Sequence, residues 1–321
     1  MTAILGLLNP HAQGGRLRQR APALRQALTA HAPAARWGMP ETVDEAQALI
    51  RQLPAASRVV ALGGDGTVNR WLPALLEGGH TLGLVPLGSG NDLARALGVY
   101  GLSCTEALAC ALTAPASGMD VGVVEGQASR NPGRDGASGR VPFLSSLATG
   151  FDASVGLRAL HGPRWLRGQP RYLWATLKEL VQLRSWTLDI RCDPIEGGGE
   201  QGTHWRGRVL LASTLNTRTY GSGMPAAPDA RIDDGRLDLL CAQAMGRAGV
   251  LTLLPRLLRG THLGDPRVVL RAVHALQIHA EDPMPLAVDG EYLGAFNQFA
   301  VRVLPGHLPA VNATKSPHFG K

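Results

Sequence analysis

The sequence has few cysteines and no long apolar run, and each absence excludes a class of protein. Its four cysteines form no Cys-x-x-Cys pair, so we read them as buried thiols of a reducing compartment, not as a disulfide framework or a zinc site. No stretch of about 18 apolar residues occurs, so no transmembrane helix is predicted. The ten histidines show neither His-x-His nor His-x-x-x-His spacing, which argues against a histidine metal site.

The N-terminus carries no basic flank before a short apolar run, so no signal peptide is predicted and a cytoplasmic location is expected. The formal net charge is +7 and the pI is about 9.7. Such a charge favours an anionic partner, either a nucleotide, a phospholipid surface or a nucleic acid. Nucleic acid is the poorest of these, because no recognised motif is present and the basic residues do not form blocks.

The first 120 residues alternate between strand and helix patterns, which is typical of a parallel sheet covered on both faces. Ligands bind such sheets at the carboxyl ends of the strands, where three glycine-rich turns fall. The expected strands are Ala3–Leu8, Ala34–Gly38, Arg58–Leu62 and Thr81–Pro86, and the expected helices are Arg16–His31, Val43–Leu53, Val68–Glu77 and one that starts at Asp92–Leu97.

The pattern changes near Met119 to many short strands and few helices, which predicts a β-rich second domain. We therefore expect an α/β domain over residues 1–122, a β-rich domain over 123–305, and a tail over 306–321 that lacks regular structure and packs back on the first domain. The segment Gly126–Arg140, rich in Gly, Ser and Arg, is expected to be a mobile hairpin loop.

Residues 63–67 read Gly-Gly-Asp-Gly-Thr directly after an apolar strand. Glycines let backbone N–H groups approach phosphate oxygens, and a following helix start adds its positive dipole end. A carboxylate in such a cradle would repel phosphate unless a cation, most simply Mg²⁺, lay between them. The motif predicts a Mg-nucleotide site; a tight turn between strand and helix is the alternative.

A second loop of this kind spans Pro86–Arg95. Gly88 and Gly90 free the backbone, while Ser89 and Asn91 offer side-chain hydrogen bonds. The loop carries a carboxylate, that of Asp92, where a helix is expected to start. Alone this pattern is weak, but its place shortly after Gly-Gly-Asp-Gly-Thr strengthens it.

The order of these motifs resembles the diacylglycerol kinase catalytic family, which includes bacterial lipid kinases and sphingosine and ceramide kinases. The resemblance implies an α/β N-terminal domain with a parallel sheet, of the type shared by NAD kinase and diacylglycerol kinase, and a β-rich C-terminal domain. The further matching segments are Asn9-Pro10, Met119–Gly122, Thr149–Ala153, Asn216, Tyr220–Gly223, Ala227–Asp238 and Asp289–Glu291.

The resemblance also implies roles. Glu291 would be the general base, Asp65 and Asp120 would be catalytic, and these two with Asp92 would organise Mg²⁺. Each role has an alternative that stays open: a solvated turn for Glu291, a carboxylate at a helix N-terminus for Asp92, and a surface acid at a strand end for Asp120.

Two further sets follow from the resemblance. The ATP site would be lined by Asn9, Thr42, Gly63, Gly64, Asp65, Gly66, Thr67, Asn69, Ser89 and Asn91. A second Mg²⁺ would bind the carboxylate of Asp234 and the backbone carbonyls of Arg231 and Arg236. Thr42 also fits a helix cap, with Glu45 at capping-box spacing, and the second metal site also fits a metal-free hairpin turn. One departure from the family is Arg70, where glutamate is usual.

The expected activity is transfer of the γ-phosphate of ATP to a hydroxyl of diacylglycerol. Phosphatidylglycerol, sphingoid bases and ceramide are alternative acceptors, and an NAD kinase or a non-catalytic nucleotide-binding regulator are less favoured alternatives. A kinase of lipids must meet a bilayer, so peripheral contact at the inner membrane is expected, and a homodimer stays open.

Basic and aromatic residues alternate between Arg164 and Trp186, a pattern that fits a headgroup interface. We favour a purely structural role, in which an amphipathic helix packs Leu173, Leu177 and Leu180 on the second domain. The run Leu253, Leu254, Leu257 and Leu258 is likewise expected in the core.

Overall fold

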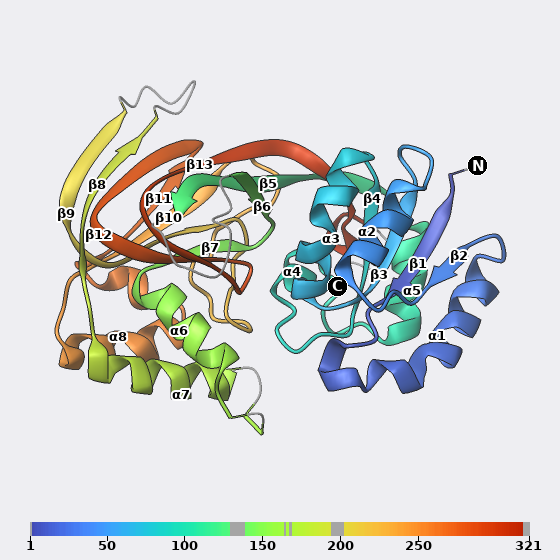
Figure 1. Ribbon diagram of the computed structural model, residues 1–321, viewed down its shortest axis with the longest axis horizontal. Coiled ribbons are helices and arrows are strands. Elements are labelled where there is room, and N and C mark those ends of the chain that lie inside the picture. Colours follow the sequence, from blue (N-terminus) through green and yellow to red (C-terminus); the bar gives the residue numbers. More distant parts are fainter. Residues whose placement is uncertain (1, 129–138, 164, 167–168, 194–201, 317–321) are drawn as a thin grey trace. The chain divides into compact units, whose positions relative to one another are not determined.

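The computed structural model describes residues 2–128, 139–163, 165–166, 169–193 and 202–316, and it divides the chain into two compact units. The first unit combines Met1–Met119 with Pro305–Lys321, and the second is Asp120–Leu304. Figure 1 labels the elements, and each unit is described by itself below. Most of the expected loop Gly126–Arg140 lies outside the described residues.

The sheet of the first unit has the order β2-β1-β3-β4, and every neighbouring pair is parallel. Its interior strands are continuous apolar runs that are almost wholly buried, as expected of strands covered on both faces. The strands are β1 (Ile4–Leu8), β2 (Arg36–Gly38), β3 (Arg58–Gly63) and β4 (Thr81–Pro86).

Helices cover this sheet because parallel strands need crossover connections. The chain moves outward from β1 to β2 and then reverses to β3 and β4, so right-handed crossovers place α1 on one face and α2 and α3 on the other. α1 and α5 share one apolar cluster with the strands. The elements are η1 (Ala12–Gly15), α1 (Leu17–His31), α2 (Val43–Arg51), α3 (Asp65–Glu77), α4 (Asp92–Ala96) and α5 (Cys104–Thr113).

The C-terminal segment completes the first unit. Strand β13 (Glu291–Val311) ends beside β4, where Ala310 pairs with Leu82 in parallel, and η4 (Ala313–Lys315) follows. The N–H of Ala313 donates to the carbonyl of Leu97. The expectation that the tail after Pro305 lacks regular structure is therefore wrong, since its backbone pairs with a strand and its apolar side chains are buried.

The second unit is built on antiparallel pairs in the order β11-β10-β9-β7-β12-β13. The shorter strands β8 and β7 lie end to end between the long strands β9 and β12, and β5 pairs with β6. The strands are β5 (Ala116–Ala128), β6 (Gly139–Phe143), β7 (Ser146–Thr149), β8 (Trp186–Cys192), β9 (Thr203–Leu215), β10 (Leu237–Gln243), β11 (Val268–Val273) and β12 (Ala275–Val288).

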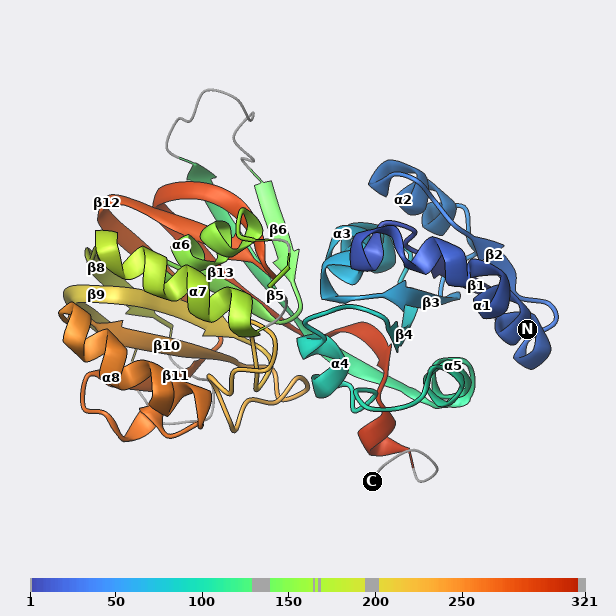
Figure 2. The same cartoon turned by 90° about the horizontal axis from the view of Figure 1, so that it is seen from below.

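Helices lie on one side of these strands, as Figure 2 shows. α6 packs on β7, β9 and β12, and α7 packs on α6. The core between them holds Phe143, Leu188, Ile278, Leu286 and Phe299, each at most 2% exposed. The helices are α6 (Phe151–Leu160), α7 (Gln169–Glu179), η2 (Leu180–Gln182), α8 (Arg247–Leu258) and η3 (His262–Gly264).

Candidate active site

The first group of predicted site residues lies in the first unit, at the turn between β3 and α3. β3 ends at Gly63 and α3 begins at Asp65, so the N–H groups of its first turn point outward at the carboxyl ends of the strands. Asn9 fastens this turn, because its Nδ2 donates to Thr67 Oγ1 at 2.8 Å and its backbone N–H donates to the carbonyl of Leu62. This arrangement suits an anion such as a phosphate.

The two glycine-rich loops lie against each other, backbone to backbone. The N–H of Leu87 donates to the carbonyl of Gly63 at 2.7 Å. A Cβ on Gly64 would lie 2.7 Å from the Cα of Gly88, and one on Gly88 would lie 2.5 Å from the Cα of Gly64. Only glycine fits at either position, so the close approach of these loops is encoded directly in the sequence.

The carboxylate of Asp65 binds the backbone at the start of α4. Asp65 Oδ2 accepts from the N–H of Asp92 at 2.8 Å, and its Oδ1 accepts from the N–H of Leu93 at 3.3 Å. Asp92 is buried, and Nη1 of Arg95 lies 3.8 Å from its Oδ1. Asp92 is the first residue of α4, so the alternative role at a helix N-terminus is present in the structure.

Asn91 lies in the second glycine-rich loop and has one side-chain atom without a hydrogen-bond partner among the described residues. Its Nδ2 donates to the carbonyl of Gly88 at 3.0 Å, and its backbone is left-handed with φ 59°. Its Oδ1 is buried and finds no hydrogen-bond partner among the described residues. A buried acceptor of this kind is costly unless a ligand or water donates to it.

Three other residues are expected to contact the nucleotide: Thr42, Asn69 and Ser89. Thr42 Oγ1 accepts from the N–H of Glu45 at 3.1 Å and caps α2. Asn69 is half-buried on α3, and Ser89 is exposed between β4 and α4. The structure thus gives Thr42 its helix-cap role, and nucleotide contact by these three residues stays a prediction.

Replacement of Gly88 by alanine tests whether the two glycine-rich loops together bind the phosphates of ATP. The added methyl group forces the two loops apart, at a cost of about 1–3 kcal/mol for overpacking. We expect ATP to bind about tenfold or more weakly, measured by calorimetric titration or nucleotide fluorescence. Gly156→Ala is the matched control, because a Cβ there meets nothing within 4 Å. Unchanged ATP affinity in Gly88→Ala would show that the loops do not hold the nucleotide.

A second group of predicted site residues belongs to the second unit, where Asp289 and Gly290 form the hairpin turn between β12 and β13. Both residues have positive φ, 46° and 86°, as an Asp-Gly turn of type I′ requires. The turn makes Glu291 the first residue of β13, paired with Val288. Glu291 is half-buried there.

The carboxylate of Asp289 clamps a distant segment. It accepts from the N–H groups of Leu144, Ser145 and Ser146 at 2.8, 2.8 and 2.9 Å. Three hydrogen bonds from backbone amides to one carboxylate are charge-assisted and strong. They fix the turn that carries Glu291 against the residues between β6 and β7.

Asn216 links that segment to Asp120. Its Nδ2 donates to the carbonyls of Leu144 and Asp120 at 2.8 and 2.9 Å. Its Oδ1 and the hydroxyl of Ser145 are both buried and find no hydrogen-bond partner within the described ranges. In the sequence, Asn216 is notable only as a match to the family. Its spacing from Leu144 and Asp120, 72 and 96 residues, leaves no local signal for this role.

Asp120 is buried at 1% exposure, so the alternative of a surface acid is wrong. Its N–H donates to the carbonyl of Ile232, and its Oδ2 accepts from the N–H of Gly235, both at 2.7 Å. The structure therefore brings Asp120 to the Asp-Asp-Gly turn that was predicted to hold a second cation.

The Asp-Asp-Gly turn has the features of a hairpin turn. Asp234 Oδ1 accepts from the N–H of Arg236 at 3.1 Å, and Gly235 has φ 72°. Arg231 contacts Asp233, with Nε and Oδ1 3.5 Å apart. Burial, and then the nearby carboxylates of Asp234 and Asp229, raise the pKa of Asp238 to about 6.

Asp152, in the segment Thr149–Ala153, forms a buried network that the sequence did not reveal. Its Oδ2 accepts from the hydroxyl of Ser213 at 3.1 Å, and Tyr220 also hydrogen-bonds to it. Burial raises the pKa of Asp152 to about 6 in spite of these hydrogen bonds.

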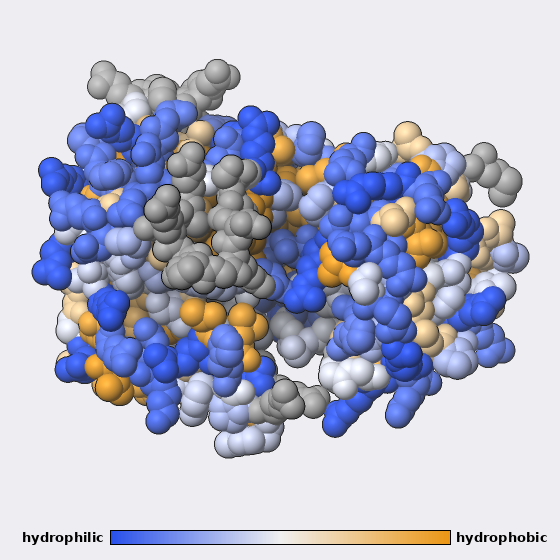
Figure 3. Space-filling view, in the orientation of Figure 1, coloured by the Kyte–Doolittle hydropathy of each residue, from blue (hydrophilic) through white to orange (hydrophobic). Residues whose placement is uncertain are grey.

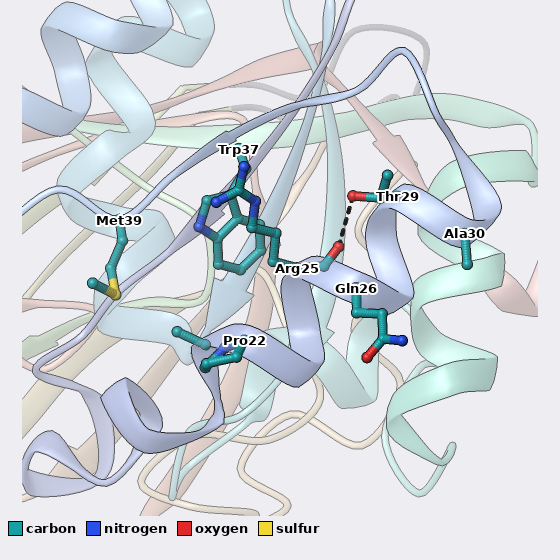
Figure 4. Close-up of a pocket in the computed structure, with 8 residues that line it drawn as sticks. Pro22, Arg25, Gln26, Thr29, Ala30, Trp37 and Met39 are labelled. Atoms are coloured by element: carbon teal, nitrogen blue, oxygen red, sulfur yellow. Dashed lines mark hydrogen bonds between the residues drawn. The ribbon is translucent and has the colours of Figure 1, made fainter.

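Two further features of the described residues bear on the site. No group of three or more His, Cys, Asp and Glu side chains there is arranged to hold a metal ion, so the three-carboxylate Mg²⁺ set stays a prediction. A cavity of about 810 Å³ lies between α1 and the edge strand β2 (Figure 4). No predicted site residue is among those lining it, which are Ala21, Pro22, Arg25, Gln26, Thr29, Ala30, Trp37 and Met39.

Two family models match this chain. Residues 3–124 match the family described as diacylglycerol kinase catalytic domain. Residues 145–312 match the YegS C-terminal NAD kinase beta sandwich-like domain.

Two relatives show how far the similarity extends. A diacylglycerol kinase of Mycobacterium tuberculosis is 32% identical over 235 residues, which cover 73% of this chain and 70% of the relative. A probable lipid kinase YegS-like of Pseudomonas fluorescens is 31% identical over 273 residues, which cover 83% and 82%.

The fold has a solved counterpart. The crystal structure of a putative diacylglycerol kinase from Bacillus anthracis superposes with a TM-score of 0.72 at 19% identity, and covers 99% of this chain and 98% of that one. Both family models, the two relatives and this structure agree, so the chain belongs to the family of diacylglycerol kinases and YegS-type lipid kinases, and it is a kinase.

Proposed function

We propose that this lipid kinase transfers the γ-phosphoryl group of ATP to a hydroxyl of diacylglycerol in a Mg²⁺-dependent reaction. The observation that carries the proposal is the cradle of Gly64 and Gly88 beside the carboxylate of Asp65. Backbone N–H groups there would bind the phosphates, and Asn9 and Thr67 would keep the first turn of α3 in place.

The residues present fit Mg²⁺. The carboxylate of Asp65 lies at the start of α4, and Asn216 Oδ1 and Ser145 Oγ are buried oxygens without a partner among the described residues. Hard oxygen donors of this kind suit the ion. When bound, Mg²⁺ would neutralise charge on the phosphates. As the family resemblance implies, Asp65, Asp92 and Asp120 would hold it, and Asp234 with the backbone carbonyls of Arg231 and Arg236 would hold a second ion.

Glu291 would act as the general base. Its carboxylate would accept the proton of the lipid hydroxyl while that oxygen attacks the γ-phosphorus, and the bond to the β–γ bridging oxygen breaks to release ADP. Asp289 supports this role, because its three hydrogen bonds fix the turn that presents Glu291.

Diacylglycerol is the proposed acceptor because the relatives of Bacillus subtilis and Mycobacterium tuberculosis are named diacylglycerol kinases. Phosphatidylglycerol or a ceramide-type lipid is the second candidate, since other relatives are named only as probable lipid kinases. No described helix has the length and apolar character of a membrane span. We propose peripheral contact with the inner membrane, because the acceptor is a membrane lipid.

Transfer of label from γ-labelled ATP tests the proposal. The protein is incubated with Mg²⁺ and mixed micelles that contain diacylglycerol, phosphatidylglycerol, sphingosine or ceramide, and in parallel with NAD. We expect one labelled product, phosphatidate, and its loss when EDTA removes Mg²⁺. A different labelled lipid would correct the acceptor. Labelled NADP, or no transfer to any acceptor, would overturn the proposed function.

A further inference from the structure

Large apolar side chains are exposed mainly in one region of the second unit. Nine such side chains are exposed among the described residues, and seven of them lie on α6, α7, η2, α8 or the turn between α6 and α7. Figure 3 shows apolar surface in the part of the molecule where Figure 1 draws α6 and α7. We call these seven the apolar face: Leu160, Trp165, Leu173, Leu177, Val181, Leu251 and Leu258.

The centre of the apolar face is a stripe along α7 and η2. Leu173, Leu177 and Val181 follow at intervals of four residues and are 41%, 48% and 68% exposed. Elsewhere around α7, Ala175 and Thr176 are buried, and Tyr172 and Trp174 pack against the core. The expectation that Leu173 and Leu177 pack inward is therefore wrong, because α7 is apolar on two sides and only one of them meets the core.

Helix α8 continues this face. Leu253 and Leu257 pack against the core as expected, but Leu258 is 40% exposed, against the prediction, and Leu251 is 48% exposed. The guanidinium of Arg247 donates to the carbonyls of Leu180 and Val181 at 2.8 and 2.9 Å. These bonds tie the start of α8 to η2, where the stripe ends at Val181.

Basic residues outnumber acids in the two segments that carry the apolar face. Between Ser154 and Trp186 the sequence has six Arg or Lys residues and one acid, Glu179. That acid is paired with Arg158 at 2.5 Å, while Lys178 and Arg184 are exposed. The segment from Arg247 to Arg259 adds three arginines and no acid. Exposed apolar side chains in segments with an excess of basic residues complement an anionic lipid surface.

We propose that the apolar face docks on an anionic phospholipid bilayer, with the α7 stripe and Trp165 entering the boundary between headgroups and acyl chains. The inference rests on the proposed function, since a kinase of lipids must reach its acceptor in a membrane. Trp165, at 80% exposure, is the residue type that prefers this boundary. A second copy of the chain is a poorer occupant, because self-association would bring basic residues against basic residues.

Vesicle binding tests the proposal with the full chain and without nucleotide. The vesicles contain phosphatidylcholine, alone or mixed equally with phosphatidylglycerol, and no diacylglycerol. We expect the wild type to bind the anionic vesicles and the triple variant Leu173→Ser/Leu177→Ser/Val181→Ser to bind them at least tenfold more weakly. Lys178→Ala should weaken binding about fivefold, and salt should weaken wild-type binding. Val269→Ser, at a residue 51% exposed on β11, is the matched control and should bind as the wild type does.

Activity on a water-soluble short-chain diacylglycerol separates docking from catalysis. We expect the triple variant to keep wild-type turnover on this acceptor and to lose turnover on diacylglycerol in vesicles. Docking by this face is overturned if the wild type ignores anionic vesicles, if the triple variant binds them normally, or if Val269→Ser loses binding equally. It is also overturned if gel filtration shows a wild-type dimer that the triple variant breaks. A wild type that binds vesicles but phosphorylates no lipid would contradict the proposed function and leave the docking surface supported.

Discussion

Glu291→Gln is expected to lower kcat about 10²- to 10⁴-fold, the range over which general acid–base groups act. Glutamine keeps the size and hydrogen-bonding reach of the side chain at the first position of β13, but it cannot take the proton of the lipid hydroxyl. The KM for ATP should change little, because Glu291 belongs to the second unit and the phosphate cradle to the first. Initial rates over a range of ATP and lipid concentrations measure both quantities.

The pH profile adds a second readout for Glu291. The wild-type rate should rise with pH as the base loses its proton, and the rate of Glu291→Gln should not show that rise. Glu281→Gln is the control, because Glu281 lies on the same hairpin, exposed and paired with Arg206. If Glu291→Gln turned over at the wild-type rate, the assignment of the base would be wrong.

Asp289→Ala is expected to lower the free energy of unfolding by about 3–6 kcal/mol, since it leaves three backbone N–H groups without their acceptor. Alanine is also strained at φ 46°. Asp289→Asn should cost about a third as much, because Oδ1 serves Ser145 and Ser146 and only the bond to Leu144 is lost. Urea unfolding followed by circular dichroism measures the series.

Turnover should follow the same order where the variants are folded. Asp289→Asn should lower kcat without a change in the KM for ATP, since a looser turn misplaces Glu291. Asp282→Ala, at an exposed position of β12, the strand that leads into the turn, should be neutral in both stability and rate. An Asp289→Ala protein as stable and active as the wild type would show that the clamp does not support the site.

The inner strands of the first unit could be predicted closely. Expected strands Arg58–Leu62 and Thr81–Pro86 correspond to β3 (Arg58–Gly63) and β4 (Thr81–Pro86), because each is a short apolar run that ends in glycine or proline. The cap of α2 at Thr42 was also readable, since the capping signal is local.

Features that depend on distant partners could not be predicted. Pro305 and Pro309 suggested a tail without regular structure, but β4 lies more than 200 residues earlier in the chain and pairs with the end of β13. The prediction that Leu173 and Leu177 of α7 pack inward was wrong for a related reason. Periodicity shows which residues of a helix are apolar, but not whether a neighbouring element covers them.

The same limit applies to the site. The sequence motifs identify four site carboxylates, those of Asp65, Asp92, Asp120 and Glu291. The structure adds the contacts that position them. Asp289 reaches its partners across 143–145 residues, and Asn216 reaches Leu144 across 72. Such supports leave no trace in local sequence, because the fold alone brings them together.

The path of β13 has a consequence for biosynthesis. The first unit takes its nucleotide loops from the start of the chain, but its sheet is completed by Pro305–Val311, which leaves the ribosome after the whole second unit. A nascent chain therefore exposes the open edge of β4 while residues 120–304 are being made. An unpaired strand edge is a site of aggregation. The phosphate cradle is translated early, yet the domain that carries it can finish folding only at the end of synthesis.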